Sequence, residues 1–164
     1  MNSVVIRNAE IEDVKQISEI VVEDWKIAYK GIIDDDFLES MNAEKQYEKE
    51  IKRYKNYVVA VNDSNEVLGY AWRQILDTDE MADCEIVALY VKYAYRKNGI
   101  GKKLLLDTID NFKEIGKKKM IIWCLKENYE SRKFYEKMGG KESEISSHKW
   151  RDKEYNIISY LYDL

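Results

Sequence analysis

The sequence contains no proline, only two cysteines and only one histidine among its 164 residues. Without proline, turns depend on glycine, asparagine, aspartate and serine, as in the segment VNDSNEVLG. Cys84 and Cys124 each lie in an apolar run with no further cysteine or histidine at metal-ligand spacing, so we expect small buried side chains and no metal site. A cysteine nucleophile would need His148, whose surroundings, SSHKWRD, predict an exposed turn. A cysteine–histidine enzyme is therefore set aside.

Long apolar runs and an excess of positive charge are also missing. No run approaches the roughly 20 residues that cross a bilayer, and the start, MNSVVIRNAEIED, lacks the features of a signal peptide. We therefore expect a cytoplasmic protein with no membrane partner. The formal net charge of −4 argues against a general nucleic-acid binder, which usually carries a strongly basic face. The length favours one domain, residues 1–164, around a single core.

The remaining sequence alternates between helical and strand patterns. Apolar residues recur at three- and four-residue steps from Glu10 to about Gly31 and predict an amphipathic helix. Similar reasoning predicts three more helices, at about 35–54, 99–115 and 129–138. Apolar, β-branched and aromatic runs predict seven strands, at about 3–8, 57–62, 66–76, 84–91, 119–125, 141–147 and 154–163. This pattern is typical of one mixed α/β domain.

The segment 95–109, YRKNGIGKKLLLDTI, places two glycines and several basic residues at the start of a predicted helix. Glycine is unfavourable in a helix interior, but unpaired N–H groups at a helix start bind phosphate, and glycine lets the phosphate approach them. The dinucleotide fingerprint does not fit, because Leu104 stands where a third glycine belongs. The P-loop pattern fails at Arg96 and Lys103. The pattern that fits is R-x-x-G-x-G at 96–101, which predicts a bound anion.

Two longer segments resemble the motifs of one enzyme family. EIVALYVKYAYRKNGIGKKLL closely resembles the central motif of the GNAT superfamily of acetyl-CoA-dependent N-acetyltransferases, and WCLKENYESRKFYEKMGGK resembles its second motif. The early segment WKIAYKGII resembles the first helices of many bacterial members. The resemblance implies a central mixed, mostly antiparallel sheet of about seven strands, flanked by about four helices. Tyr93 and Gly140 depart from the family pattern, where many members have a proline and an aromatic residue.

The resemblance also assigns cofactor-binding residues. It places the diphosphate of acetyl-CoA on the backbone amides of the R-x-x-G-x-G turn, with Lys102 beside it; the turn consists of Arg96, Lys97, Asn98, Gly99, Ile100 and Gly101. The pantetheine arm would lie like a short strand against main-chain groups of Leu89, Tyr90 and Val91. Asn128 matches the residue that bonds this arm, although asparagine also suits the N-cap of helix 129–138.

Two residues are predicted to be catalytic. Tyr135 matches the family's usual general acid, which would protonate the departing thiolate, although a tyrosine here also suits helix packing. Glu85 is the candidate base, directly or through water, because it precedes Arg96 by the same spacing as the catalytic glutamate of the histone-acetylating branch. Burial would raise its pKa and suit it to this task. An exposed glutamate at a strand start is the alternative. A backbone N–H near Leu89 would polarise the thioester carbonyl.

The acetyl acceptor is predicted only as a class. Acidic residues at 34–36 and 77–83 favour a small cationic amine, such as a polyamine or an aminoglycoside-like sugar, over a protein lysine or N-terminus. Such charged loops are more often simply solvated. Four aromatic residues are candidates for lining the pocket or for filling the core: Trp25, Tyr29, Trp72 and Trp150.

The predicted function is transfer of acetyl to an amine by direct attack in a ternary complex. A catalytically silent cofactor sensor with the same fold is the alternative, and a nucleic-acid contact through the basic loop is disfavoured by the net charge. Both a monomer and a homodimer remain open.

Overall fold

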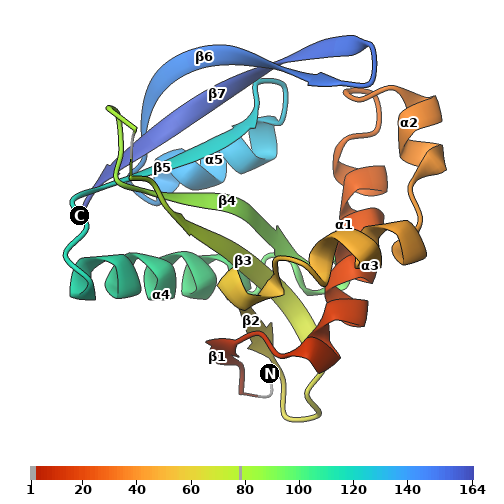
Figure 1. The fold of residues 1–164 in the computed structure, drawn as a ribbon, viewed down its shortest axis with the longest axis horizontal. Helices are drawn as coiled ribbons and strands as arrows, with labels where there is room; N and C mark the ends of the chain where they lie inside the picture. Colours follow the sequence, from red (N-terminus) through yellow and green to blue (C-terminus); the bar gives the residue numbers. More distant parts are fainter. Residues whose placement is uncertain (1–2, 78) are drawn as a thin grey trace. The chain divides into compact units, whose positions relative to one another are not determined.

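The computed structural model describes residues 3–77 and 79–164, so the predicted acidic loop 77–83 is described except for Thr78. Figure 1 shows the elements in chain order. The strands are β1 (Val5–Asn8), β2 (Tyr57–Val61), β3 (Val67–Ile75), β4 (Cys84–Val91), β5 (Lys119–Leu125), β6 (Lys141–Trp150) and β7 (Lys153–Asp163). The α-helices are α1 (Val14–Ala28), α2 (Asp35–Ser40), α3 (Ala43–Glu50), α4 (Ile100–Glu114) and α5 (Tyr129–Lys137). Short 3-10 turns lie at Ile11–Asp13, Tyr54–Asn56 and Tyr93–Tyr95.

The seven strands form one sheet in the order β1-β2-β3-β4-β5-β7-β6. β4 and β5 pair in parallel, whereas β1–β2, β2–β3, β5–β7 and β6–β7 are antiparallel. The prediction of a mixed, mostly antiparallel sheet is therefore confirmed.

The described residues contain five α-helices, one more than the predicted four. The chain becomes extended at Met41 (φ −72°, ψ 133°), and the side chain of Asn42 then accepts a hydrogen bond from the Lys45 N–H at 2.9 Å. This N-cap starts a new helix. The expected continuous helix at 35–54 is thus wrong, because α2 and α3 replace it.

The chain divides into two compact units, each built from two segments. Unit 1 comprises the chain up to Arg73 and Ala88–Asp110, and unit 2 comprises Gln74–Val87 and Asn111–Leu164. β4 begins in unit 2 and ends in unit 1. The two units are described separately below.

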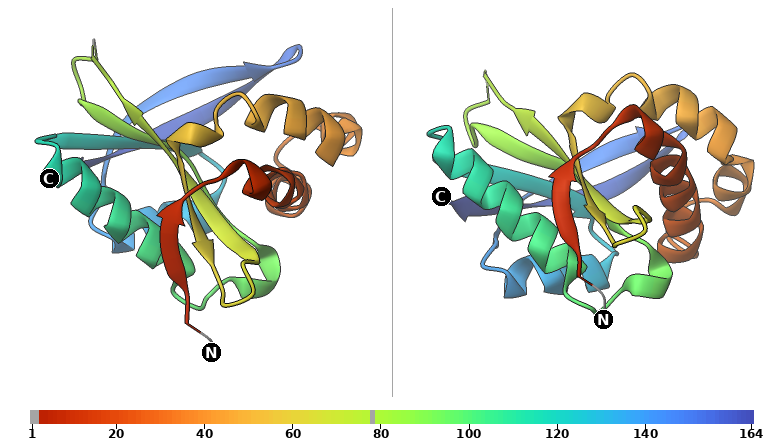
Figure 2. Two further views of the ribbon diagram at one scale, coloured as in Figure 1. Left: turned by 60° about the horizontal axis from the view of Figure 1, so that its bottom comes forward. Right: turned by 90° about the horizontal axis from the view of Figure 1, so that it is seen from below.

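Unit 1 contains β1, β2 and most of β3, which form an antiparallel ribbon (Figure 2). Alternate residues of β2 enter two different apolar clusters, as expected for a strand covered on both faces. Tyr57 and Val59 pack with residues of α1, whereas Val58 and Ala60 pack with Ile100 and Leu104 of α4.

A close backbone approach occurs in unit 1 at Gly69 of β3. A Cβ atom at this position would lie 2.7 Å from the carbonyl oxygen of Tyr90 and 3.2 Å from the Cα of Val91. The glycine therefore lets β3 approach the last residues of β4 closely.

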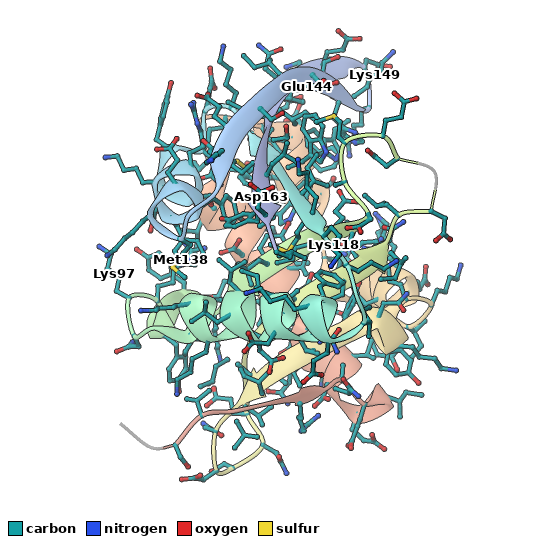
Figure 3. The ribbon with its side chains drawn as sticks, turned by 90° about the vertical axis from the view of Figure 1, so that its left-hand side faces the viewer. Lys97, Lys118, Met138, Glu144, Lys149 and Asp163 are labelled. Carbon is teal, nitrogen blue, oxygen red and sulfur yellow. The ribbon has the colours of Figure 1, made fainter. Side chains whose placement is uncertain are left out.

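In unit 2, β5 pairs with the start of β4 on one side and with β7 on the other. β6 pairs only with β7 in the described strands and is three residues longer than predicted. Its residues are almost all exposed on both faces, and Figure 3 labels Glu144 and Lys149 on it. Because no face is buried, β6 lacks the alternation by which a strand end is predicted.

Within the described residues, no helix combines the length and apolar character needed to cross a membrane. The same residues contain no cluster of three or more histidine, cysteine, aspartate or glutamate side chains placed to hold a metal ion.

Candidate functional site

In unit 1, the first four residues of the R-x-x-G-x-G segment form a loop before α4, and its last two, Ile100 and Gly101, begin the helix. Lys97 (φ 63°) and Gly99 (φ 80°) both adopt left-handed backbone conformations, and Lys97 is labelled on this loop in Figure 3. Left-handed residues in a loop can turn neighbouring N–H groups toward the same side, which is the arrangement of anion-binding sites built from main-chain amides. A Cβ atom at Gly99 would meet no protein atom within 4 Å, so the space beside the loop is open.

The start of α4 supplies further N–H groups. The Lys103 N–H donates to the Gly99 carbonyl at 3.0 Å. The preceding N–H groups, at Ile100, Gly101 and Lys102, therefore have no acceptor within the helix. The positive end of the helix dipole lies at the same place. The exposed Lys102 and Lys103 side chains supply further positive charge.

The Arg96 side chain, by contrast, contacts the protein itself. Its guanidinium pairs with the buried carboxylate of Asp24 in α1, and its Nε donates to the Val91 carbonyl at 3.4 Å. The same group lies 5.3 Å above the ring of Tyr93. Asp24 was not identified from the sequence, because no local pattern connects α1 with this loop.

The end of β4 also belongs to unit 1. Leu89 and Val91 pack in the cluster that contains the first turns of α4, whereas Tyr90 packs on the α1 side and accepts a hydrogen bond from Trp25 Nε1 at 2.8 Å. The parallel register of β4 with β5 comprises three pairs and ends at Ile86–Ile122. β4 continues for five residues beyond its last parallel pair.

Glu66, the residue before β3, holds the segment between β4 and the R-x-x-G-x-G loop in place. Its carboxylate accepts hydrogen bonds from Lys92 Nζ at 2.9 Å and from the Tyr95 hydroxyl at 3.0 Å. The bonds from Lys92 and Tyr95 lower the pKa of Glu66.

Glu85 and Asn128 lie in unit 2. Glu85 is half-buried between the fully buried Cys84 and Ile86, and burial, followed by the charge of Asp79, raises the pKa of its carboxyl. This is the direction expected of a general base. The Asn128 side chain accepts a hydrogen bond from the Ser131 N–H at 3.3 Å, so this residue is the N-cap of α5.

Tyr135 lies on α5 in unit 2, and only 6% of its surface is exposed. Its carbonyl accepts hydrogen bonds from the Gly140 N–H at 2.9 Å and from the Tyr162 hydroxyl at 2.8 Å. The Gly139 N–H donates to the Glu136 carbonyl, which completes a Schellman motif with Gly139 at φ 99°.

The ring of Tyr162 explains one departure from the family pattern. A Cβ atom at Gly140 would lie 2.8 Å from this ring and 2.9 Å from the Tyr135 carbonyl oxygen. An aromatic side chain from β7 therefore occupies the space beside residue 140, where many family members carry an aromatic residue in the second motif.

The two cysteines carry thiols of raised pKa. Burial raises the pKa of Cys84 to about 12 and that of Cys124 to about 11. Both side chains are thus held as thiols at neutral pH and are unsuited to nucleophilic attack.

The aromatic residues of unit 1 that are candidates for lining the acceptor pocket have different surroundings. Trp25 packs edge-on against Tyr29, with ring centroids 4.9 Å apart. The ring of Trp72 lies 4.5 Å below the guanidinium of Arg53, whose Nε donates at 2.8 Å to the fully buried carboxylate of Glu50. Trp72 therefore packs against a partly exposed arginine that is paired with a buried glutamate. Trp150, in unit 2, packs against His148 and Tyr155.

Some of the acidic residues have structural roles. Asp83 accepts hydrogen bonds from the N–H groups of Lys118 and Lys119, and Asp79 accepts from those of Met81 and Ala82. Burial works to raise the pKa of Asp83, but the backbone bonds outweigh it and lower that pKa. Asp35 and Asp36 lie in the first turn of α2, where negative charge is favourable.

The model of the acetyltransferase (GNAT) family matches residues 15–140. The chain belongs to this family. It is 32% identical over 150 residues to a spermidine N(1)-acetyltransferase of Thermoplasma acidophilum, with 85% of this chain and 89% of that protein covered. It is 30% identical over 128 residues to an uncharacterised N-acetyltransferase, YuaI, of Bacillus subtilis, with 76% and 73% covered.

Among solved structures, the chain is similar to that of the PaiA N-acetyltransferase of Thermoplasma acidophilum in complex with coenzyme A. The TM-score is 0.78 at 27% identity, and 98% of this chain and 99% of that chain are covered. The predicted family, fold and enzyme class are thus confirmed.

Proposed function

We propose that this N-acetyltransferase transfers the acetyl group of acetyl-CoA to a primary amine of a small polycation. The observation that carries the proposal is the start of α4, where the left-handed Lys97 and Gly99 precede the N–H groups of residues 100–102, which have no acceptor within the helix, beside open space at Gly99. The family match spans residues of both units, which supports one N-acetyltransferase domain over residues 1–164.

In the proposed complex, the diphosphate of the cofactor binds to the N–H groups of residues 97–102. The main chain of Leu89, Tyr90 and Val91 binds the pantetheine arm as an added strand, supported by the extension of β4 past its last pair with β5. The side-chain oxygen of Asn128 caps α5, so the side-chain N–H₂ of the same residue is the group we assign to the cofactor arm. No metal ion has a role in this proposal.

The proposed reaction is a direct transfer. The amine nitrogen attacks the thioester carbonyl carbon, the carbon–sulfur bond breaks, and the sulfur leaves with its electron pair. Before the attack, Glu85, with its raised pKa, takes one proton of the substrate ammonium directly or through water, which frees the nitrogen lone pair. The Tyr135 hydroxyl gives its proton to the leaving sulfur. The second proton, lost by the nitrogen as the amide forms, replaces the one that Tyr135 gives up.

A polyamine is the proposed acceptor class because a relative that is 32% identical is a spermidine N(1)-acetyltransferase. The exposed carboxylates of Asp35 and Asp36 supply negative charge that suits a polycation. Asp79 and Asp83 are weaker candidates, since both already accept backbone hydrogen bonds.

The decisive experiment is an acetyl-transfer screen over polyamines, aminoglycosides, amino acids and peptide N-termini, combined with calorimetric titration of coenzyme A. We expect binding of the cofactor and turnover of a polyamine, with Tyr135→Phe slowing kcat about 100-fold or more. Cofactor binding without turnover of any amine would favour the sensor function. Absence of cofactor binding would refute the proposal.

The pH profile tests the role of Glu85. Because burial raises its pKa, kcat/KM should fall on the acidic side at a pH above the ordinary glutamate range of about 4.3. Glu85→Gln should remove this limb and lower the plateau. An unchanged profile would assign the base to another group.

A further inference from the structure

Two adjacent residues of α1 hold the end of β4 and the loop that follows it. The indole Nε1 of Trp25 donates to the Tyr90 hydroxyl at 2.8 Å, and the carboxylate of Asp24 pairs with Arg96. All four residues belong to unit 1, and α1 is far from the other two in sequence. One turn of α1 thus contacts both the strand and the first residue of the R-x-x-G-x-G turn.

This arrangement directs the Arg96 guanidinium toward the protein. It faces the Asp24 carboxylate, the Val91 carbonyl and the ring of Tyr93, and 23% of the side chain remains exposed. The exposed loop lysines, Lys97 and Lys102, have no comparable contacts with buried groups among the interactions described. The loop therefore separates two tasks, with Arg96 facing the protein and the lysines facing solvent.

Burial makes the pair a strong restraint. Only 5% of the Asp24 side chain is exposed, and a buried carboxylate is unfavourable unless a partner stays in place. A planar guanidinium with several fixed donors holds its acceptors in one orientation. The position of Arg96 is therefore coupled to that of α1.

Arg96 directly precedes the left-handed Lys97, and the left-handed Gly99 follows two residues later. A shift of Arg96 would displace the N–H groups that follow it, and misplacement of a binding group by about 1 Å is enough to weaken a site substantially. We propose that Asp24 is a positioning residue for the diphosphate loop: through its ion pair with Arg96 it fixes the N–H groups of residues 97–102. This inference rests on the proposed function, because it concerns the same cofactor site.

The test measures coenzyme A binding by calorimetry in the absence of an acceptor, so that it does not depend on knowing the acceptor. Asp24→Asn should weaken binding about ten-fold. The double variant Asp24→Asn/Arg96→Gln, which leaves no unpaired charge, should weaken it by about the same factor, because both variants remove one interaction. The same loss is expected when each variant is titrated with dephospho-coenzyme A in place of coenzyme A, because this ligand keeps the diphosphate and lacks only the 3′-phosphate.

Glu19→Gln is the matched control, since it makes the same carboxylate-to-amide change at an exposed position of α1. It should leave the affinity unchanged. Asp24→Glu restores the charge with a longer side chain and should recover part of the affinity.

The outcomes separate this inference from the proposed function. If the wild-type protein binds no coenzyme A, the proposed function itself fails. If the wild type binds and the folded double variant binds equally tightly, the ion pair only stabilises the fold and the positioning role is refuted. Because the double variant contains no unpaired buried charge, it distinguishes the two roles even if Asp24→Asn alone does not fold. If neither folds, Asp24→Glu decides. The positioning role predicts only part of the wild-type affinity in this variant, so an affinity equal to that of the wild type would refute the role.

Discussion

Two of the glycine-containing helix ends of this protein use glycine for opposite reasons. Gly99, before α4, has a left-handed backbone and open space around its Cα. Gly140, after α5, has no such φ, and its space is filled by the ring of Tyr162 and the carbonyl of Tyr135. Space left open by the protein can admit a ligand, whereas space filled by the protein's own side chains serves the fold. The same residue type in two adjacent motifs therefore predicts binding in one place and packing in the other.

The strongest test of the open end is Gly99→Glu. A side chain at φ 80° costs roughly 1–2 kcal/mol of folding free energy, and the new carboxylate would repel the cofactor diphosphate. We expect coenzyme A affinity to fall about 100-fold, equivalent to about 2.7 kcal/mol, as measured by calorimetry. Gly116→Glu is the matched control, because Gly116 (φ 84°) is equally open and follows the other end of α4. Equal loss of affinity in both variants would contradict the comparison.

The filled end is tested by Gly140→Ala. Its Cβ atom would overlap the buried ring of Tyr162 and a main-chain oxygen, neither of which moves freely. We expect the free energy of unfolding in urea to fall by about 1–3 kcal/mol. In a Tyr162→Ala background the same substitution should cost less, since part of the overlap is removed. Additive effects would show that the ring does not set the requirement for glycine.

Gly69→Ala tests a position that is filled yet lies beside the proposed cofactor strand. Because its Cβ atom would lie 2.7 Å from the Tyr90 carbonyl oxygen, β4 must shift. We expect a loss of about 1–2 kcal/mol in unfolding free energy and an affinity for coenzyme A lowered about three-fold, close to 0.7 kcal/mol. Paired urea titration and calorimetry measure both quantities. A loss of stability with unchanged affinity would exclude the end of β4 from cofactor binding.

The smallest expected effect concerns the anchor of the open loop. Glu66 has a lowered pKa, so its contribution is present above the ordinary carboxyl pKa of about 4.3 and is lost as the pH falls through the lower folded-state value. About a third of the side chain is exposed (32%), so solvent screens its interactions and Glu66→Gln should cost less than about 1 kcal/mol at pH 7. Its stability should approach that of the wild type as the medium becomes more acidic. A constant difference across pH would assign the effect to lost packing.

The sequence predicted those parts of the fold whose conformation is determined by residues nearby in the sequence. β4 and β5 were predicted with the same bounds as in the structure, because continuous apolar runs bounded by polar residues define buried strands. The break at Asn42 was missed because its cap competes with an otherwise helical run of glutamate and lysine. The ends of β6 depend on pairing with β7, which leaves no periodic pattern in an exposed strand.

The candidate site was predictable to the same extent. The glycine spacing predicted the turn before α4, whereas the catalytic role of Tyr135 and the cofactor-binding role of Asn128 stay predictions from the motif. The partners Asp24 and Tyr162 could not be found, since each meets its partner across a large sequence separation and belongs to an unremarkable local pattern. For Glu85, the direction of the pKa shift could be predicted only because burial of its side chain was expected.

The interleaving of the two units has a practical consequence for dissecting this enzyme. The chain leaves unit 1 after Arg73, re-enters it at Ala88 and leaves again after Asp110, so no uninterrupted fragment contains either unit alone. The shortest fragment that contains all of unit 1 also carries Gln74–Val87, and the shortest that contains all of unit 2 also carries Ala88–Asp110, so neither truncation nor a single proteolytic nick yields one unit by itself. Point substitutions, rather than deletion mapping, are therefore the means to assign cofactor binding and catalysis to their residues.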